Sequence, residues 1–328
     1  MTRHAKSMPV VSLFMPRSTA YTNANKTGYW SFIQPSYSEK TSPCSEACPC
    51  GTDIPRVEML AAEGRFAAAW RTILAENPLP GVCGRVCFHP CEAACNRAEL
   101  DEAVTVNALE RFLSDAAEAD GSSAGLARRP SKGKRIAVVG SGPAGLSAAY
   151  FLSLLGYDCD LLEAGDELGG VLRTGIPAYR LPSEALDRDI ARITSLGVRA
   201  RTGVKVDEAF LRAAGKEYAA VFIACGNGKP MRLGAEGDGA VEDALSFLAG
   251  VRKGKAEVRP SKLPAAVVGG GNSAIDTARS LLRLGAKPVI VYRRRREDMP
   301  AFDKEVREAL AEGATIMELL SPLSIARD

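Results

Sequence analysis

The chain has 328 residues, of which 46% are hydrophobic and 25% are charged, and its formal net charge is +3. This length predicts two or three domains with substantial cores. The charge lacks the strong basic excess of a dedicated nucleic-acid-binding protein, so we expect a soluble globular protein that binds no nucleic acid.

The N-terminal segment carries no targeting signal that we recognise. Its longest apolar run, Pro9 to Met15, is interrupted by Ser12, is too short to span a bilayer and precedes no small-residue cleavage pattern. Residues 1–30 are polar and irregular and predict an extended arm. Nine cysteines without a secretion signal suit a reducing compartment, so we expect a cytoplasmic protein with no membrane insertion.

Helical periodicity begins at Asp53, a good N-cap, and a second helix follows Gly64. A third helix is predicted from Thr105 to Ala117. No strand pattern appears before residue 130, so residues 31–117 are expected to form a helical domain. The apolar positions that these helices are expected to bury are Val57, Leu60, Ala61, Phe66, Ala69, Trp70, Ile73, Leu74, Val106, Leu109 and Leu113.

Residues 118–134 are rich in glycine, serine and charge and predict a linker. A different pattern follows. A short apolar run at 136–139 predicts a strand, GSGPAG comes next, a helix extends to Leu155, and a second strand is predicted at 158–162. This order is that of a Rossmann-type β-α-β unit.

The same order recurs further along the chain, with a strand at 265–268, GGGNSA, a helix to Leu284 and a strand at 288–292. The predicted fold class is therefore α/β, with an N-terminal α-helical domain followed by two Rossmann-type dinucleotide-binding units. We place these units at residues 135–235 and 236–328. Cys159 and Cys225 lie in apolar strand runs and are expected in the cores.

Seven cysteines lie close together in the helical region: Cys44, Cys48, Cys50, Cys83, Cys87, Cys91 and Cys95. A continuous helix would spread the last four around its axis, so their segment is expected to loop around a bound group. Gly84, Pro90 and Asn96 would permit this irregular path. Thiolates are soft ligands and favour an iron–sulfur cluster here. The alternatives are zinc, although Cys-x2-Cys pairs are lacking, and buried or disulfide-bonded cysteines.

Three segments, CSEACPCGTDIP, NPLPGVCGRVCFHPCEAAC and VNALERF, resemble the N-terminal domain of the small subunit of NADPH-dependent glutamate synthase, which dihydropyrimidine dehydrogenase shares. The resemblance extends from about residue 40 to the end of the chain. It implies two [4Fe-4S] clusters on the helical domain. The ligands that it implies are Cys48, Cys87, Cys91 and Glu110 for one cluster and Cys44 and Cys95 for half of the other.

One part of the family pattern is replaced, because Ser36 and Glu39 stand where the family has an upstream Cys-x2-Cys pair. Our hypothesis is that Cys50 and Cys83 replace this missing pair and complete the half-supplied cluster of Cys44 and Cys95, the first cluster in chain order, so that seven cysteines and Glu110 supply eight ligands. Iron analysis giving about four atoms per chain instead of about eight would contradict it. The alternatives are a bystander role for Cys50 and Cys83 and an exposed helical carboxylate for Glu110.

GSGPAG has the context of a dinucleotide-binding loop. Gly140 is expected to make the tight turn, Gly142 to let the backbone approach a pyrophosphate, and Gly145 to let helix and strand pack closely. Glu163 ends the second strand, where it can accept hydrogen bonds from a ribose. The residues expected to bind the first dinucleotide are therefore Gly140, Gly142, Pro143, Ala144, Gly145 and Glu163.

The segment ELGGVLRTGIPAYRLP resembles the stretch of this family that lies along FAD. The resemblance implies that Gly169 and Gly170 approach the flavin and that Arg180 contributes charge or a hydrogen bond. It also identifies the first dinucleotide as FAD, which the glycine spacing alone does not distinguish from NAD.

The second glycine loop is the GxGxxA variant, and the strand after it ends in a run of arginines instead of an acid. Arginine suits the 2'-phosphate of NADPH, whereas an acid would suit the ribose of NADH. We expect NADPH or NADH here and favour NADPH, with a solvated basic turn as the alternative. The residues expected at this site are Gly269, Gly271, Asn272, Ser273, Asp276, Arg293 and Arg294.

The predicted function is an NAD(P)H:acceptor oxidoreductase that passes electrons through FAD and the clusters to a redox partner protein or a larger catalytic subunit, or in the reverse direction. No acid–base residue is predicted, because the cofactors perform the chemistry. The alternatives are a glutamate synthase small subunit, a flavoprotein partner of dissimilatory sulfite reductase, which KTGYWSFIQPSYSEKTSPC resembles, and a non-catalytic cluster-bearing scaffold subunit.

In the family that this chain resembles, the polypeptide returns after the nicotinamide domain and completes the FAD domain. The present sequence ends at Asp328, so we expect the second half of the FAD domain to be absent from it. Three explanations are open: a fragment of a longer polypeptide, a separate chain that completes the site, or weak flavin binding.

Overall fold

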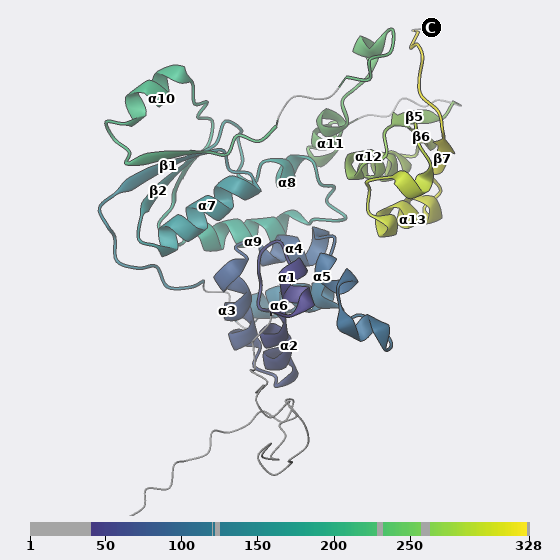
Figure 1. The fold of residues 1–328 in the computed structure, drawn as a ribbon. Helices are drawn as coiled ribbons and strands as arrows, with labels where there is room; N and C mark the ends of the chain where they lie inside the picture. Colours follow the sequence, from purple (N-terminus) through teal and green to yellow (C-terminus); the bar gives the residue numbers. More distant parts are fainter. Residues whose placement is uncertain (1–40, 120, 122–124, 228–231, 257–262, 327–328) are drawn as a thin grey trace, which may run out of the picture. The chain divides into compact units, whose positions relative to one another are not determined.

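The computed structural model describes residues 41–119, 121, 125–227, 232–256 and 263–326. The predicted arm and the positions of Ser36 and Glu39 lie outside the described residues. Figure 1 shows the N-terminal helices gathered into one group. Its elements are α1 (Pro43–Ala47), α2 (Ile54–Ala62), α3 (Phe66–Glu76), α4 (Pro80–Val86), α5 (Pro90–Ala93), the 3-10 helix η3 (Asn96–Glu99) and α6 (Val106–Ala119).

The three predicted helices are confirmed as α2, α3 and α6, and the described residues before 130 contain no strand. Asp53 caps α2 as expected, because its carboxylate accepts a hydrogen bond from the backbone N–H of Arg56. The helices pack around Trp70, which is buried. The other buried residues of this core are Val57, Leu60, Ala69, Ile73, Leu74, Leu113 and Ala117. Phe66, expected inside, is 38% exposed and stacks edge-on against Phe112.

The cysteine segment is not a continuous helix, as predicted. The break lies between the end of α4 at Val86 and the start of α5 at Pro90. Gly84 has a different role from the expected one, because it lies inside α4 where this helix crosses α6. A β-carbon at Gly84 would be 2.6 Å from the backbone nitrogen of Arg111. The glycine therefore permits close helix packing instead of an irregular path.

The first nucleotide-binding unit contains a parallel four-stranded sheet of order β3-β2-β1-β4, with α7 against it. Its strands are β1 (Arg135–Val139), β2 (Asp158–Leu162), β3 (Arg199–Arg201) and β4 (Ala220–Ile223). Its helices are α7 (Pro143–Leu154), α8 (Val171–Thr174), α9 (Ser183–Thr194) and α10 (Glu208–Ala214). The predicted β-α-β order of this unit is confirmed.

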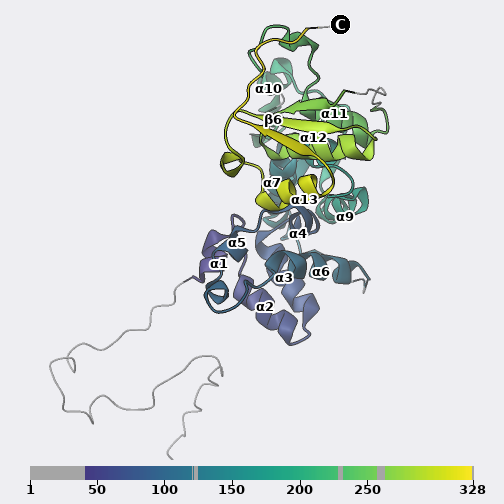
Figure 2. The same cartoon turned by 90° about the vertical axis from the view of Figure 1, so that its right-hand side faces the viewer.

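The second unit contains a parallel three-stranded sheet of order β5-β6-β7. Its strands are β5 (Ala265–Val268), β6 (Pro288–Tyr292) and β7 (Thr315–Glu318). Its helices are η4 (Asp238–Ala240), α11 (Ala244–Arg252), α12 (Asn272–Arg283), η5 (Arg296–Asp298) and α13 (Asp303–Ala311). Figure 2 shows α12 beside the strands of this sheet, against which it packs. None of the described helices combines the length and apolar composition needed to cross a bilayer.

The expectation for the two remaining cysteines is half right. Cys159 lies in β2 and is 1% exposed, as predicted. Cys225 is exposed, so its predicted place in a core is wrong. It follows β4, which is an edge strand that pairs only with β1 and whose residues remain largely exposed among the described parts of the chain.

Buried polar contacts join the helical domain to the first nucleotide-binding unit. Asp189 on α9 is 1% exposed and accepts a hydrogen bond from the backbone N–H of Val82 on α4, at 3.0 Å. Arg192 donates to Asp189 and to the carbonyl of Pro78. A β-carbon at Gly81 would lie 3.1 Å from the Asp189 carboxylate, so α4 begins in close contact with α9. Burial raises the pKa of Asp189 despite Arg192.

Candidate functional site

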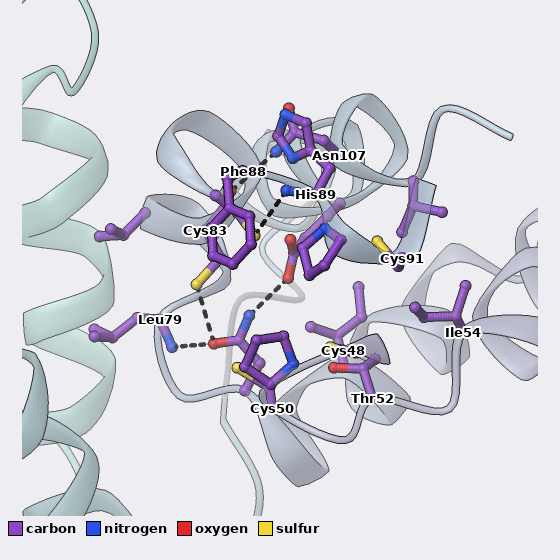
Figure 3. A pocket seen from close by; sticks show the side chains of 18 of the residues that line it. Cys48, Cys50, Thr52, Ile54, Leu79, Cys83, Phe88, His89, Cys91 and Asn107 are labelled. Carbon is purple, nitrogen blue, oxygen red and sulfur yellow. Dashed lines mark hydrogen bonds between the residues drawn. The ribbon is translucent and has the colours of Figure 1, made fainter. Parts of the chain in front are cut away.

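A cavity of about 300 Å³ in the helical domain gathers most of the predicted metal ligands. Figure 3 shows Cys48, Cys50, Cys83 and Cys91 around the same space. Six of the eight predicted ligands line this cavity: Cys48, Cys50, Cys83, Cys87, Cys91 and Glu110. Cys44 and Cys95 are not among its lining residues. The six donors come from three segments of the chain, which are brought together by the packing of α4 against α6 and of α1 against α5.

The cavity raises the pKa of three of its thiols, those of Cys48, Cys87 and Cys91. A hydrogen bond with Cys50, followed by burial, raises the pKa of Cys48 to about 12. Burial also raises the pKa of Cys91 to about 12 and that of Cys87 above its usual value. Thiolates form when a metal centre supplies the compensating charge. This donor set therefore fits a group rich in soft metal ions.

Glu110 faces the cavity and is held there by Asn77. The Asn77 side-chain amide donates to the Glu110 carboxylate at 2.7 Å, and its oxygen accepts from the backbone N–H of Leu79 at 2.9 Å and from the Cys83 thiol at 3.7 Å. Burial raises the pKa of Glu110 to about 8. The alternative of a solvent-exposed helical carboxylate does not describe this residue.

The size of the cavity suits a cluster better than a single ion. Within the described residues, no three His, Cys, Asp or Glu side chains converge closely enough to hold one metal ion. Zinc needs ligands at about 2.3 Å from one centre, whereas these donors enclose a wider space. The structure places Cys50 and Cys83 on this wall beside Cys48, and not with Cys44 and Cys95. Their completion of the first cluster stays a prediction.

The first glycine loop has the geometry that the sequence predicts. Gly140 has a φ of +100° between β1 and α7, and a β-carbon there would overlap the carbonyl of Ala224. A β-carbon at Gly145 would overlap the carbonyl oxygen of Gly140. The first residue thus makes the turn, and the second lets α7 pack against the loop.

The space in front of α7 is open. A β-carbon at Gly142 would meet no atom within 4 Å. Gly142 caps this twelve-residue helix, and Pro143 and Ala144 form its exposed first turn. The unpaired N–H groups at the start of a helix bind phosphate groups. The loop therefore fits the pyrophosphate of a dinucleotide.

Glu163 and Ser141 form one hydrogen-bonded unit beside this loop. The Glu163 carboxylate accepts from the backbone N–H of Ser141 and from that of Gly165, both at 2.8 Å, and from the Ser141 hydroxyl. Burial alone would raise the pKa of Glu163, but these hydrogen bonds outweigh it and hold the pKa below its usual value. Sequence reasoning missed Ser141, although its place between two loop glycines was a signal.

The segment predicted to lie along FAD folds back onto the glycine loop. The backbone N–H of Gly169 donates to the Ser141 carbonyl at 3.1 Å. A β-carbon at Gly170 would lie 2.8 Å from the α-carbon of Gly142. Both glycines have positive φ angles. Their conformations allow the segment to cover the loop, and their approach to a flavin stays a prediction.

Arg180, predicted beside the flavin, joins the two nucleotide-binding units. Its guanidinium pairs with Asp276 on α12 at 2.8 Å and with Glu305 on α13 at 3.1 Å. The Arg180 and Asp276 side chains are 9% and 6% exposed. The structure thus pairs residues that the sequence assigned to different nucleotides, 96 positions apart.

The second glycine loop repeats the geometry of the first. Gly269 has a φ of +138°, and a β-carbon at Gly271 would meet no atom within 4 Å. Sequence reasoning missed Gly270, where a β-carbon would overlap the ring of Tyr292. The loop therefore leaves open space before α12, as a second pyrophosphate requires.

The polar residues predicted at the second site lie in two places, at the start of α12 and directly after β6. Asn272 accepts a hydrogen bond from the backbone N–H of Phe302 at 3.0 Å, and Ser273 is exposed in the first turn of α12. Arg293 and Arg294 are exposed directly after β6. Their contact with a nucleotide stays a prediction.

The thiol-lined cavity also contacts the first nucleotide-binding unit. Pro143 from the start of α7 and Leu172 from α8 line it together with the cysteines. The glycine loop that fits a pyrophosphate and the donors that fit a cluster therefore meet at one cavity.

Comparison with known families agrees with both parts of the structure. Residues 37–122 match the family described as dihydropyrimidine dehydrogenase domain II, 4Fe-4S cluster. Residues 134–316 match the pyridine nucleotide-disulphide oxidoreductases. The chain belongs to the iron–sulfur flavoprotein NAD(P)H oxidoreductases that include the small subunits related to glutamate synthase and the N-terminal part of dihydropyrimidine dehydrogenase.

Curated relatives match most of this chain. The NADP(+)-dependent formate dehydrogenase subunit beta of Moorella thermoacetica is 38% identical, over 88% of this chain and 44% of its own length. The NADPH-Fe(3+) oxidoreductase subunit beta of Geobacter sulfurreducens is also 38% identical, with the same coverage. The NAD-dependent dihydropyrimidine dehydrogenase subunit PreT of Salmonella typhimurium is 34% identical, over 87% of this chain and 70% of its own. The chain thus spans less than half the length of the first two.

A solved structure of 2-naphthoyl-CoA reductase with 2-naphthoyl-CoA shares the fold. It superposes with a TM-score of 0.53 and is 21% identical, over 85% of this chain and 39% of its own. At this identity the likeness concerns the fold alone.

Proposed function

We propose that this chain is the electron-transfer part of an NAD(P)H:acceptor oxidoreductase. The observation that carries the proposal is the cavity lined both by cysteines and by Pro143 and Leu172 of the first nucleotide-binding unit. Electrons would enter at a dinucleotide site beside α7. A cluster held in the adjoining cavity would then be their next acceptor. The family membership supports the same cofactor classes: iron–sulfur, FAD and a pyridine nucleotide.

The protein groups position the cofactors in this proposal. Gly142 and the first turn of α7 bind the FAD pyrophosphate, and the charged Glu163 accepts hydrogen bonds from its ribose. Gly271 and Ser273, at the start of α12, bind the pyrophosphate of the nicotinamide dinucleotide in the same way. When bound, the nicotinamide supplies a hydride, the flavin takes up its two electrons and the iron–sulfur clusters carry them singly. The cysteines and Glu110 hold the clusters in an apolar surrounding.

We propose two [4Fe-4S] clusters and a redox partner protein or larger catalytic subunit. Subunit names among the relatives support the second point. Cysteines that serve as iron ligands must remain reduced, so a cytoplasmic location accompanies the proposal.

The visible spectrum of the anaerobically purified protein tests the function. We expect flavin bands together with broad iron–sulfur absorption, and bleaching of both when NADPH is added. A scaffold without catalytic activity would show iron–sulfur absorption and no flavin band. A spectrum that keeps its flavin bands after addition of NADPH and of NADH would contradict the oxidoreductase.

The nucleotide preference depends on the exposed arginines after β6. We expect Arg294→Glu to raise the KM for NADPH roughly tenfold and to leave the KM for NADH nearly unchanged, because a charge-assisted hydrogen bond to the 2'-phosphate is lost. Steady-state reduction of a dye acceptor measures both. Arg307→Glu, at an exposed position on α13, is the matched charge control. An equal rise in the KM for NADPH and in the KM for NADH would contradict the assignment of Arg294 to the 2'-phosphate.

A further inference from the structure

His89 lies between two cysteines of the cavity in a backbone conformation that few residues adopt. Its φ and ψ angles are 54° and 55°, and the other non-glycine residue with a positive φ among the described residues is Leu319. Pro90 follows it, and proline disfavours helical backbone angles in the preceding residue. Glycine would adopt the left-handed conformation without strain. A histidine here therefore calls for compensating interactions.

The strained backbone places a donor on a predicted ligand. The N–H of His89 donates to the sulfur of Cys87 at 3.4 Å, and its carbonyl accepts from the N–H of Glu92 at 3.0 Å. The second bond starts α5, which carries Cys91. The turn at His89 thus brings Cys87 and Cys91 to the same cavity.

His89 is also one of the residues that line the cavity. Its Nδ1 atom is buried, and no described residue hydrogen-bonds to it. A buried polar atom without a partner is unfavourable unless a bound group supplies one. A group in the cavity that accepts hydrogen bonds would satisfy it, and the sulfur atoms of an iron–sulfur cluster are such acceptors.

We propose that His89 is a positioning residue that sets the reduction potential of a cluster held in this cavity. Its backbone N–H stays on the Cys87 sulfur, and its imidazole offers a second donor toward the cluster. Hydrogen bonds to cluster sulfurs favour the reduced, more negative state and so raise the potential. The inference rests on the proposed function, because it requires a cluster at this site.

The variant His89→Gly tests the contribution of the imidazole ring alone. Glycine removes the ring but keeps the left-handed turn and the backbone N–H that donates to Cys87. We expect unchanged iron and sulfide content, an unfolding midpoint equal to or above that of the unmodified protein, and a lower reduction potential. The expected change is at least tenfold in the ratio of reduced to oxidised cluster, about 59 mV for a one-electron couple. His89→Ala should lower the potential at least as much, because it also strains the turn. Redox titration followed by electron paramagnetic resonance measures both.

Leu319→Gly is the control, because it relieves the other positive φ away from the cavity and should leave the potential unchanged. An iron-loaded His89→Gly protein with an unchanged potential would overturn the role of His89 and leave the proposed function intact. If His89→Gly loses its iron, His89→Gln decides, since glutamine restores a side-chain donor. A His89→Gln potential equal to that of His89→Ala would overturn the proposal. Absence of iron from the unmodified protein would contradict the proposed function itself.

Discussion

Gly145→Ala is expected to abolish FAD binding and to destabilise the first nucleotide-binding unit by about 3 kcal/mol. The β-carbon of alanine would overlap the carbonyl oxygen of Gly140, so α7 must move away from the loop. Flavin absorbance of the purified protein and denaturant unfolding followed by circular dichroism measure the two effects.

Gly142→Ala is the matched control, since it adds the same methyl group to the same loop. No atom lies within 4 Å of the added β-carbon, and Gly142 has a φ of −66°, which alanine adopts readily. We expect its unfolding free energy to change by less than about 1 kcal/mol and its FAD affinity to fall at least tenfold. Normal FAD affinity in this variant would contradict a pyrophosphate at the loop.

Cys87→Ser is expected to remove one cluster, about four iron atoms per chain, while the flavin remains bound. Cys87 lies on the cavity wall directly after α4, and a serine hydroxyl is a poor ligand for iron compared with a thiolate. Iron and labile sulfide analysis of anaerobically purified protein measures the loss, and the flavin-to-protein ratio shows that the neighbouring site remains.

Cys225→Ser provides the comparison, because this exposed cysteine lies outside the cavity and should leave the iron content unchanged. Cys50→Ser and Cys83→Ser, measured in the same way, show whether these two residues are ligands or bystanders. Full iron content in Cys87→Ser would exclude Cys87 as a ligand and contradict the proposed cluster site.

Sequence patterns predicted those features whose causes are local. The helix that Asp53 caps, the turn at Gly140 and the two β-α-β units each depend on residues within a few turns of one another. The pairing of Arg180 with Asp276 was not predictable, because it joins positions 96 residues apart whose separate motifs had other interpretations. The exposure of Cys225 was missed for a related reason, since an apolar strand run does not reveal that its strand lies at a sheet edge.

The predicted metal ligands illustrate the same limit. Residue type and spacing predicted a cluster-binding segment, but not which cysteines share a cavity. The place of Cys83 depends on Gly84, which lets α4 cross α6 at the backbone of Arg111. The contact between Glu110 and Asn77 joins residues 33 positions apart. Spacing along a chain carries no information about such crossings.

The hydrogen bond from the Val82 N–H to the Asp189 carboxylate can form only late in synthesis of the chain. Val82 leaves the ribosome 107 residues before the carboxylate that accepts its hydrogen bond, so α4 can pack on α6 but lacks this second anchor while the helical domain is first exposed. Cys83, a predicted ligand, follows Val82 directly, so its position gains this further support only after α9 has been translated. Loading of a cluster at the proposed site would accordingly be favoured once the first nucleotide-binding unit has folded against the helical domain.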